Sequence, residues 1–446
     1  MNADTLSSPL FTVEGGRELS GRTEVPGSKH GMVLVFAAAV ALGAKVTLEN
    51  VPQSTEFEVL SDIVHALGGT ISSGDRRTCV VDGEVSSDLL PGALTRRIHG
   101  SIYLLAAVLA QRGAVTFGGA GGDELGTYEF GLTRPIQQIL DVMALFGADW
   151  SWQGSELTVR RERLVPATVD ILRWSDDPER PAGPRVSSAT KAAVLMAAAT
   201  PGTSVILNPH DKEAQRELIA VLRELGVDIE QRDRCWIVRG RPGRQAARYR
   251  LMPDPVEVIT WQSVAVMTGS SFELDCGDTS HLVKAIRREL EFLDHLGIKP
   301  EIGDGSIRVS PAVGSYVGAQ LIAESTGIST DIAPLLALVL LKATGRSTVE
   351  DRVWRKRFGY AAPLKQLGAS TQIVGERLSI EPSILRPTEE TVLAADTRSV
   401  AVCLVAALAV AGRTTIDGIE HLARGYEALP ERLAVLGADI AYVRRG

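Results

Sequence analysis

The pattern of apolar and polar positions repeats one unit six times along the chain. In each copy an amphipathic helix ends at a glycine that follows a large apolar residue, and a short strand comes next. These segments read "VHALGGTI", "MALFGADW", "LRELGVDI", "LDHLGIKP", "LKQLGAST" and "LAVLGADI". Glycine directly after a helix adopts the left-handed conformation without steric cost. The pattern therefore predicts six helix ends, at Gly68, Gly147, Gly226, Gly297, Gly368 and Gly437.

Each copy also contains a second, more apolar helix, which is likewise followed by a strand. Its copies read "AAAVALGAKVTLENV", "LAAVLAQRGAVTFGG", "LMAAATPGTSVILNP", "VAVMTGSSFELDC", "LALVLLKATGRSTVED" and "LVAALAVAGRTTIDGI". Helices this rich in Ala, Leu and Val lack a polar face, so we expect them to be buried. The amphipathic helices should lie outside them. The sequence thus predicts an α/β fold built from six repeats of a βαβαββ unit.

The six stop glycines are 69 to 79 residues apart. Copies of this length suit two globular domains of three repeats each better than a solenoid of short repeats. Pro253 and Pro255 interrupt the pattern after the third copy. We expect two similar domains with helices inside and sheets outside: domain I over 28–249, and domain II over 1–27 plus 250–446. A cleft between two domains is a usual place for a ligand.

Composition narrows the classes of partner. The chain has 47 basic and 54 acidic residues and a net charge of −7, so no global cationic field attracts nucleic acid. Its four cysteines are far apart and form no metal-binding pair, which fits reduced thiols in the cytoplasm. The start lacks a signal-peptide pattern, and the apolar runs are too short to cross a bilayer. We expect a cytoplasmic protein without metal, nucleic-acid or membrane partners.

One lysine lies at the N-terminus of the first apolar helix. The stretch "EVPGSKHGMVLVFAAAVALG" from Glu24 to Gly43 places Lys29 after a Pro-Gly-Ser turn and beside His30. Two interpretations are open. Lys29 is either a solvated loop residue, or it holds an anion where the helix N-terminus already favours one.

Six such units, opened by "PGSK" and closed by "RGYE", resemble the enolpyruvyl transferases. The resemblance runs from Phe11 to the C-terminus. It implies a two-domain inside-out α/β barrel with its active site in the interdomain cleft. It also implies transfer of the enolpyruvyl group of phosphoenolpyruvate (PEP) to a hydroxyl group, with release of phosphate and without a cofactor.

The C-terminal half is most similar to the members of this family that act on UDP-N-acetylglucosamine. The resemblance implies that Asp331 in "STDIAPLLAL" is the catalytic base. "RKRFGYAAPLKQLGA" points to Arg357 as an acceptor contact. "AADTRSVA" gives Asp396 and Arg398 as PEP-binding residues, and "HLARGYEALPERLAVLGADI" gives Arg424 as another.

The N-terminal half departs from that type on the acceptor side. "PGSK" is the form found in EPSP synthase; it implies that Lys29 binds PEP and takes part in catalysis, with His30 as an acceptor contact. "RIHGSIYLL" has His99 where an arginine is expected, and His99 is a further candidate acceptor contact. "RVSSATKAAVLMAAA" resembles the double-serine motif that holds the acceptor's phosphate in EPSP synthase. Its acceptor-binding candidates are Arg185, Ser187 and Ser188.

The loop "GGAGGDELGTYEFGLTRP" replaces a shorter loop that carries the catalytic cysteine in relatives. The position nearest to that cysteine is Asp123, which we expect to protonate C3 of PEP. A carboxyl group there should resist the epoxide fosfomycin. Arg134 matches the arginine that follows this loop and completes a cation set for PEP with Lys29, Arg398 and Arg424. Guanidinium groups match the two-oxygen edges of phosphate and carboxylate.

Structural interpretations of the same residues stay open. Asp331 could simply cap the apolar helix that follows it, and the serine pair could cap its own helix. Arg398 could pair only with Asp396, and Arg424 only with Glu427.

The acceptor is also open. It is either a uridine monophosphate (UMP)-type nucleotide, as in similar enzymes of nucleoside-antibiotic pathways, or UDP-N-acetylglucosamine. The changed acceptor positions favour the first. An EPSP synthase-like enzyme acting on another phosphorylated acceptor, and a non-catalytic nucleotide-binding relative, are the alternatives.

Overall fold

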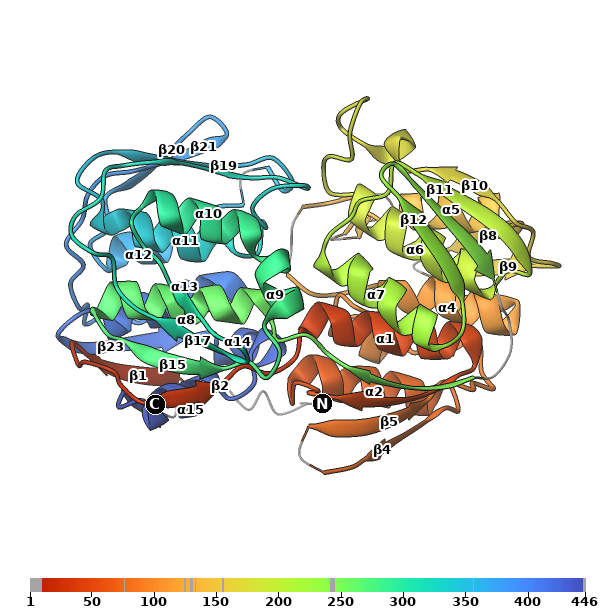
Figure 1. Cartoon of the computed structure of the whole chain (residues 1–446), viewed down its shortest axis with the longest axis horizontal. Helices are drawn as coiled ribbons and strands as arrows, with labels where there is room; N and C mark the ends of the chain where they lie inside the picture. Colours follow the sequence, from red (N-terminus) through yellow and green to blue (C-terminus); the bar gives the residue numbers. More distant parts are fainter. Residues whose placement is uncertain are drawn as a thin grey trace. The chain divides into compact units, whose positions relative to one another are not determined.

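The computed structural model describes residues 10–443 except 76, 124–125, 129–130, 133, 155, 241–244 and 356. The chain divides into two compact units (Figure 1). Unit 2 is Gly27–Met252, and unit 1 comprises the residues before Gly27 and after Met252. Unit 2 corresponds to the expected domain I, and unit 1 to domain II.

The described residues of unit 2 form three four-stranded sheets. In each sheet the first two strands are parallel and the other pairs are antiparallel. The first sheet has the order β14 (Ala246–Arg250), β3 (Lys45–Glu49), β5 (Thr78–Asp82), β4 (Thr70–Ser73). The second is β6 (Leu89–Leu90), β7 (Ala114–Phe117), β9 (Glu156–Arg161), β8 (Ala148–Gln153). The third is β10 (Thr168–Asp170), β11 (Gly202–Leu207), β13 (Cys235–Gly240), β12 (Asp228–Arg232).

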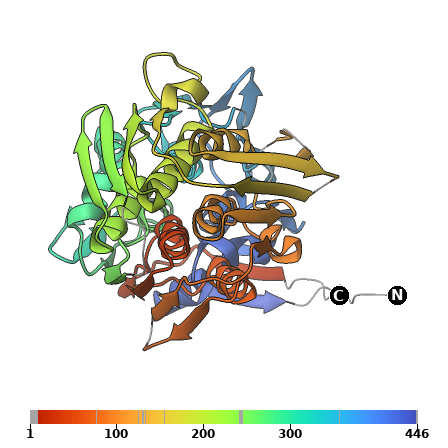
Figure 2. The same ribbon diagram turned by 90° about the vertical axis from the view of Figure 1, so that its right-hand side faces the viewer.

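Three buried helices fill the middle of unit 2 and pack against one another: α1 (Lys29–Leu42), α4 (Ile102–Arg112) and α6 (Val186–Ala199). Amphipathic helices accompany them: α2 (Thr55–Ala66), α5 (Gln137–Leu145) and α7 (Glu213–Glu224). The described part of the unit also contains the short helix α3 (Gly92–Thr95) and the 3-10 helix η2 (Ile171–Trp174). Figure 2 looks along several of these helices and shows strands around them.

Unit 1 repeats this plan. Its sheets are β2 (Arg22–Glu24), β15 (Phe272–Asp275), β17 (Ser306–Val309), β16 (Glu301–Ile302); β18 (Gln320–Ala323), β19 (Ser347–Asp351), β21 (Arg377–Ile380), β20 (Thr371–Val374); and β22 (Val392–Leu393), β23 (Gly412–Asp417), β1 (Leu10–Gly15), β24 (Asp439–Val443). The inner helices are α8 (Pro255–Thr268), α11 (Ala333–Val339) and α13 (Thr397–Leu408). The others are α9 (Ser280–Ala285), α10 (Arg287–His295), η3 (Leu340–Lys342), α12 (Ala361–Gln366), α14 (Ile419–Gly425) and α15 (Leu429–Val435).

The sixfold repeat is confirmed at its helix ends. All six predicted stop glycines have a positive φ, between 72° and 107°. The apolar helices are buried as expected: in α1, every residue from Gly31 to Leu42 is inaccessible to solvent or nearly so. The α/β class with helices inside and sheets outside is therefore present in each unit.

Gly83 marks a place where a strand end passes α1 too closely for any side chain. A Cβ atom there would lie 2.2 Å from the carbonyl carbon of Ala39. We expect Gly83→Ala to destabilise the protein by about 2–3 kcal/mol, because helix backbone would have to move. For a domain of this size, the melting temperature should fall by roughly 4–12 °C. Thermal unfolding followed by circular dichroism would measure it.

Gly74→Ala is the matched control in the same unit. Gly74 is exposed, and a Cβ atom there would lie 3.4 Å from its nearest neighbour, on Thr78. Its melting temperature should match the wild type. Equal melting temperatures for Gly83→Ala and Gly74→Ala would contradict the close approach.

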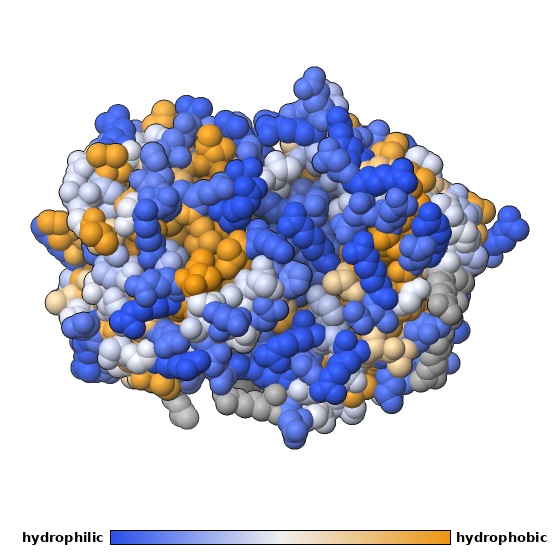
Figure 3. Space-filling model, viewed as in Figure 1, coloured by the Kyte–Doolittle hydropathy of each residue, from blue (hydrophilic) through white to orange (hydrophobic). Residues whose placement is uncertain are grey.

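The face of the molecule drawn in Figure 3 is mostly hydrophilic, with smaller hydrophobic areas on both units. No helix in the described ranges is long and apolar enough to cross a membrane. All four cysteines are free thiols; three of them are buried, and only Cys235 is partly accessible.

Candidate active site

The Pro-Gly-Ser turn places Lys29 at the start of α1. Gly27 donates its N–H to the carbonyl of Asn50 at 2.9 Å, and a Cβ atom there would lie only 2.2 Å from that oxygen. Ser28 caps the helix, since its Oγ accepts the N–H of Gly31 at 3.1 Å. Lys29 is therefore the first helical residue, half-buried at the helix mouth.

Four cationic or titratable groups surround His99. Burial is the main cause that lowers the pKa of His99 well below its ordinary value, and the charges of Arg134, Lys191, His30 and Lys29 lower it further. The imidazole is therefore neutral at pH 7. Its buried Nδ1 atom has no hydrogen-bond partner among the described residues. The structure thus gathers Lys29, His30, His99 and Arg134, which the sequence assigned to substrate binding.

Lys191 is a member of this group that the sequence analysis missed. It lies on α6 and is only 6% exposed. Its Nζ donates to the hydroxyl of Tyr103 at 3.3 Å and lies 4.9 Å from the centre of that ring. The signal in the sequence was a single charge within the apolar helix "VSSATKAAVLMAAA". We call Lys29, His30, Arg134 and Lys191, which surround the neutral His99, the cationic group.

The glycine-rich loop is built to lie against the segment that carries His99. Gly121 donates its N–H to the carbonyl of Thr95 at 3.2 Å, and a Cβ atom on it would lie 1.7 Å from the carbonyl oxygen of Arg96. At Gly122 a Cβ atom would lie 2.8 Å from the Cβ atom of His99. Asp123 follows directly and is half-buried. Its role as the acid stays a prediction, and residues 124–125 of the loop lie outside the described part of the chain.

Both serines of the double-serine motif lie in the first turn of α6, and each is bound by a glutamine. Gln215 Nε2 donates to Ser187 Oγ at 3.0 Å, and Gln138 Nε2 donates to Ser188 Oγ at 2.7 Å. The N-cap of this helix is Arg185, so the interpretation of the serines as caps is wrong. Their role and that of Arg185 in acceptor binding stay predictions.

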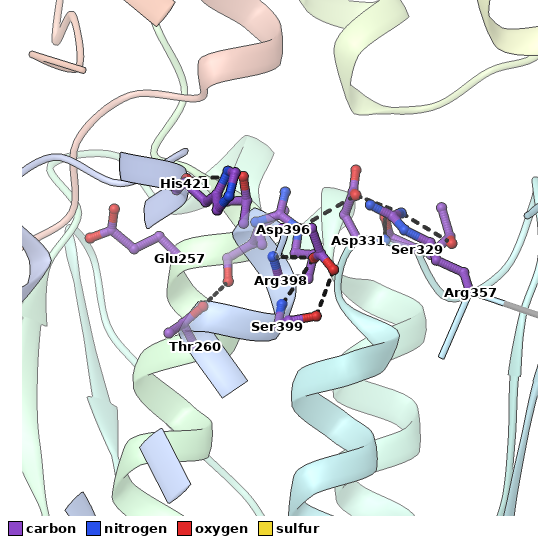
Figure 4. Close-up of polar contacts among 12 residues, drawn as sticks. Glu257, Thr260, Ser329, Asp331, Arg357, Asp396, Arg398, Ser399 and His421 are labelled. Carbon is purple, nitrogen blue, oxygen red and sulfur yellow. Dashed lines mark hydrogen bonds and ion pairs between the residues drawn. The ribbon is translucent and has the colours of Figure 1, made fainter. Parts of the chain in front are cut away.

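In unit 1, Asp331 lies between two arginines (Figure 4). Its Oδ1 accepts from Arg357 Nη1 at 2.9 Å and from Arg398 Nε at 3.4 Å. The side chains of Arg357 and Arg398 are 13% and 6% exposed, against 23% for Asp331. The interpretation of Asp331 as a helix cap is wrong, because Ile332 is the N-cap of α11. Two guanidinium groups thus hold the carboxylate in one orientation.

The guanidinium of Arg398 also faces Tyr426. Its Nη1 lies 3.5 Å from the Tyr426 hydroxyl, and its central carbon is 6.0 Å from the ring centre. The same hydroxyl is hydrogen-bonded to Thr260 Oγ1 at 2.9 Å, and burial raises the pKa of Tyr426. Tyr426 belongs to the "RGYE" segment but was not among the predicted residues. We call Asp331, Arg357, Arg398 and Tyr426 the acid–arginine group.

Asp396 caps α13 and thereby positions Arg398. Its Oδ1 accepts the backbone N–H groups of Arg398 at 2.9 Å and Ser399 at 3.0 Å, and Ser399 Oγ donates to its Oδ2 at 2.6 Å. The Arg398 guanidinium goes instead to Asp331 and Tyr426, so a pair with Asp396 alone does not describe it. A direct contact of Asp396 with PEP stays a prediction.

Arg424 lies on α14, and its Nη2 is 3.1 Å from Nδ1 of His421. Its assignment to PEP also stays a prediction. His421 was not among the predicted residues, because a histidine near an arginine has no spacing that distinguishes it in the sequence.

Comparisons with known proteins identify the family and the fold of the chain. The model of the EPSP synthase (3-phosphoshikimate 1-carboxyvinyltransferase) family matches residues 13–433. The chain is 27% identical over 437 residues to UDP-N-acetylglucosamine 1-carboxyvinyltransferase 2 of Listeria monocytogenes, with 96% of both chains covered. It is 28% identical over 441 residues to UDP-N-acetylglucosamine 1-carboxyvinyltransferase of Deinococcus deserti, covering 97% of this chain and 96% of that one.

Solved structures extend the likeness. The crystal structure of the enolpyruvyl transferase NikO from Streptomyces tendae matches with a TM-score of 0.92 and 33% identity, over 98% of this chain and 99% of that one. EPSP synthase from Acinetobacter baumannii matches with a TM-score of 0.69 at 15% identity, over 98% of this chain and all of that one, which shows a shared fold. The expected fold class is thereby confirmed.

Proposed function

Because the chain belongs to the EPSP synthase family of enolpyruvyl transferases, and its chemistry is therefore enolpyruvyl transfer, we propose that its acceptor is a hydroxyl group of a UMP-type nucleotide. The observation that carries this proposal is His99. A neutral histidine, surrounded by Lys29, Arg134 and Lys191, stands where the family resemblance leads us to expect an arginine. The acceptor side differs from that of the UDP-N-acetylglucosamine enzymes, while residues assigned to PEP are kept.

The proposed reaction has two steps. The acceptor hydroxyl adds to C2 of PEP while C3 takes up a proton, giving a tetrahedral adduct. The C2–O bond to phosphate then breaks, C3 loses a proton, and the enolpyruvyl ether and phosphate are released. We assign removal of the hydroxyl proton to Asp331 and protonation of C3 to Asp123.

The charges of PEP explain the roles that we assign to the remaining residues. A phosphate and a carboxylate on one small molecule need several converging cations. Lys29 and Arg134 of the cationic group, together with Arg398 and Arg424, supply them in this proposal. In the structure Asp331 engages Arg398 through Nε. We propose that PEP competes with Asp331 for this arginine during turnover.

UDP-N-acetylglucosamine is the second candidate acceptor. It is favoured by the curated relatives, which match over nearly the full chain and are named for that substrate. Phosphate release from PEP in the presence of UMP, uridine, UDP-N-acetylglucosamine or shikimate 3-phosphate would decide between the candidates. We expect release with UMP. Release with UDP-N-acetylglucosamine alone would overturn the UMP proposal, and release with none of them would favour a non-catalytic nucleotide-binding protein.

Asp123 gives a separate prediction about inhibition. Fosfomycin inactivates by alkylation of a thiolate, so the wild-type protein should keep full activity after exposure. Asp123→Cys should become sensitive and gain one adduct on the 118–126 peptide by mass spectrometry, because nearby cations favour a thiolate.

Asp123→Ser is the control, since it lacks both the carboxyl and the thiol group. It should be neither sensitive to fosfomycin nor labelled by it. A fosfomycin adduct within 118–126 of the wild-type protein would overturn the assignment. Labelling of Cys235, the one partly accessible thiol, would be recognised from its different peptide.

A further inference from the structure

Lys191 is a buried ammonium group without an anionic partner among the described residues of unit 2. Its contacts are the hydroxyl and the ring of Tyr103, both neutral. The side chain is 6% exposed, and Tyr103 is 7% exposed. Burying a charge is costly unless it is paired, and a phenol and a ring face compensate for only part of that cost. Such a lysine is explained if an anion binds beside it.

His99 supplies a second, independent observation at the same place. Its ring lies 6.1 Å from the ring of Tyr103 in an edge-on arrangement. Its Nδ1 atom is buried and has no hydrogen-bond partner among the described residues. Buried polar atoms are rarely left in this state. In the neutral ring, the Nδ1-protonated tautomer presents a donor that a ligand oxygen can accept.

The number of cations assigns this anion to the acceptor rather than to PEP. Lys29, Arg134, Arg398 and Arg424 already match the phosphate and carboxylate of PEP, and Lys191 exceeds that set. Lys191 and Tyr103 are also nearly inaccessible to solvent, and such a position suits the end of a ligand better than its middle. A diphosphate that continues into a sugar would need an open path on both sides.

We propose that Lys191, together with Tyr103 and His99, binds the terminal phosphate of the acceptor and so selects a nucleoside monophosphate. This inference rests on the proposed function and names the part of the acceptor that unit 2 recognises. In this proposal Lys191 on α6 supplies the positive charge for the phosphate, because His99 is neutral.

The test compares Lys191→Met with the wild type on UMP and on uridine, which lacks the phosphate. Hydrogen bonds to a charged group suggest that kcat/KM for UMP should fall roughly 10–100-fold. The value for uridine and the KM for PEP should stay within about twofold of the wild type, because neither involves Lys191. Lys45→Met, which changes an exposed lysine on β3 of the same unit, is the matched control and should behave as the wild type.

Calorimetric binding of UMP and of inorganic phosphate, without PEP, keeps this test separate from the proposed reaction. If no acceptor is turned over, the proposed function fails, but weaker UMP binding to Lys191→Met would still support the phosphate site. An unchanged preference for UMP over uridine, or a rise in the KM for PEP alone, would overturn it. Should Lys191→Met fail to fold, Tyr103→Phe replaces it, with an expected loss of a few-fold in UMP binding and none in uridine binding.

Discussion

Replacing Lys29 with alanine should lower kcat/KM by about 1,000-fold while the protein stays folded. The lysine begins α1, next to the groups that surround His99, where its charge can meet an anion on the substrate. Removing one positioned donor from a developing or bound anion typically costs about 3–4 kcal/mol. Steady-state phosphate release with saturating acceptor would measure the loss.

The variant should fold because the side chain of Lys29 is not part of the hydrophobic core. Ser28 still caps α1, and the buried face of that helix begins at Gly31. The pKa of His99 should rise in the variant, since one of the cations that lower it is lost. Histidine titration by NMR would show this change. Lys45→Ala is the control at an exposed position, and activity of Lys29→Ala equal to it would remove Lys29 from the site.

Asp331→Asn should reduce kcat by roughly 100- to 10,000-fold, the range associated with loss of a general base. The amide keeps the size of the carboxylate and can still accept from Arg357, so we expect binding of PEP to be retained. A fall in kcat without a matching rise in KM distinguishes loss of the base from loss of a binding contact.

The control for this variant is Asp304→Asn, which neutralises an exposed carboxylate in the same unit. Its kinetics should match the wild type. A kcat for Asp331→Asn within tenfold of the wild type would show that the hydroxyl proton leaves by another route. The ion pairs of Asp331 with Arg357 and Arg398 would then be structural.

The fold was largely predictable because its repeat is visible in the hydrophobic pattern of the sequence. Each inner helix is apolar on all sides and each outer helix ends at a glycine, and both features follow from local burial and backbone geometry. The two-residue strands β6, β16 and β22 could not be predicted in this way, since two residues cannot show an alternation. Nor could the partners of β1, β2 and β14, which lie far away in the chain.

The site was predictable where a residue stands at a distinctive place, and not where its meaning depends on packing. Lys29 and Asp331 adjoin the starts of apolar helices, and Arg398 follows a capping aspartate. Lys191 and Tyr426 looked like parts of buried segments, and only the structure shows that Lys191 contacts Tyr103 and that Tyr426 faces Arg398. The exchange of an expected arginine for His99 was visible in the sequence, but its neutral state follows mainly from its burial, which only the structure shows.

The pairing of β1 with β23 and β24 has a consequence for how the protein is made. Phe11 pairs with Ile416 and with Tyr442, so β1 needs neighbours that leave the ribosome long after it. At typical synthesis rates this wait is roughly 20–80 s. Unit 2 is one continuous segment and can fold in the meantime, whereas unit 1 cannot close its third sheet until β23 and β24 have been translated. Nascent chains stalled before residue 412 should therefore contain a protease-resistant unit 2 and a β1 segment that proteases still cut.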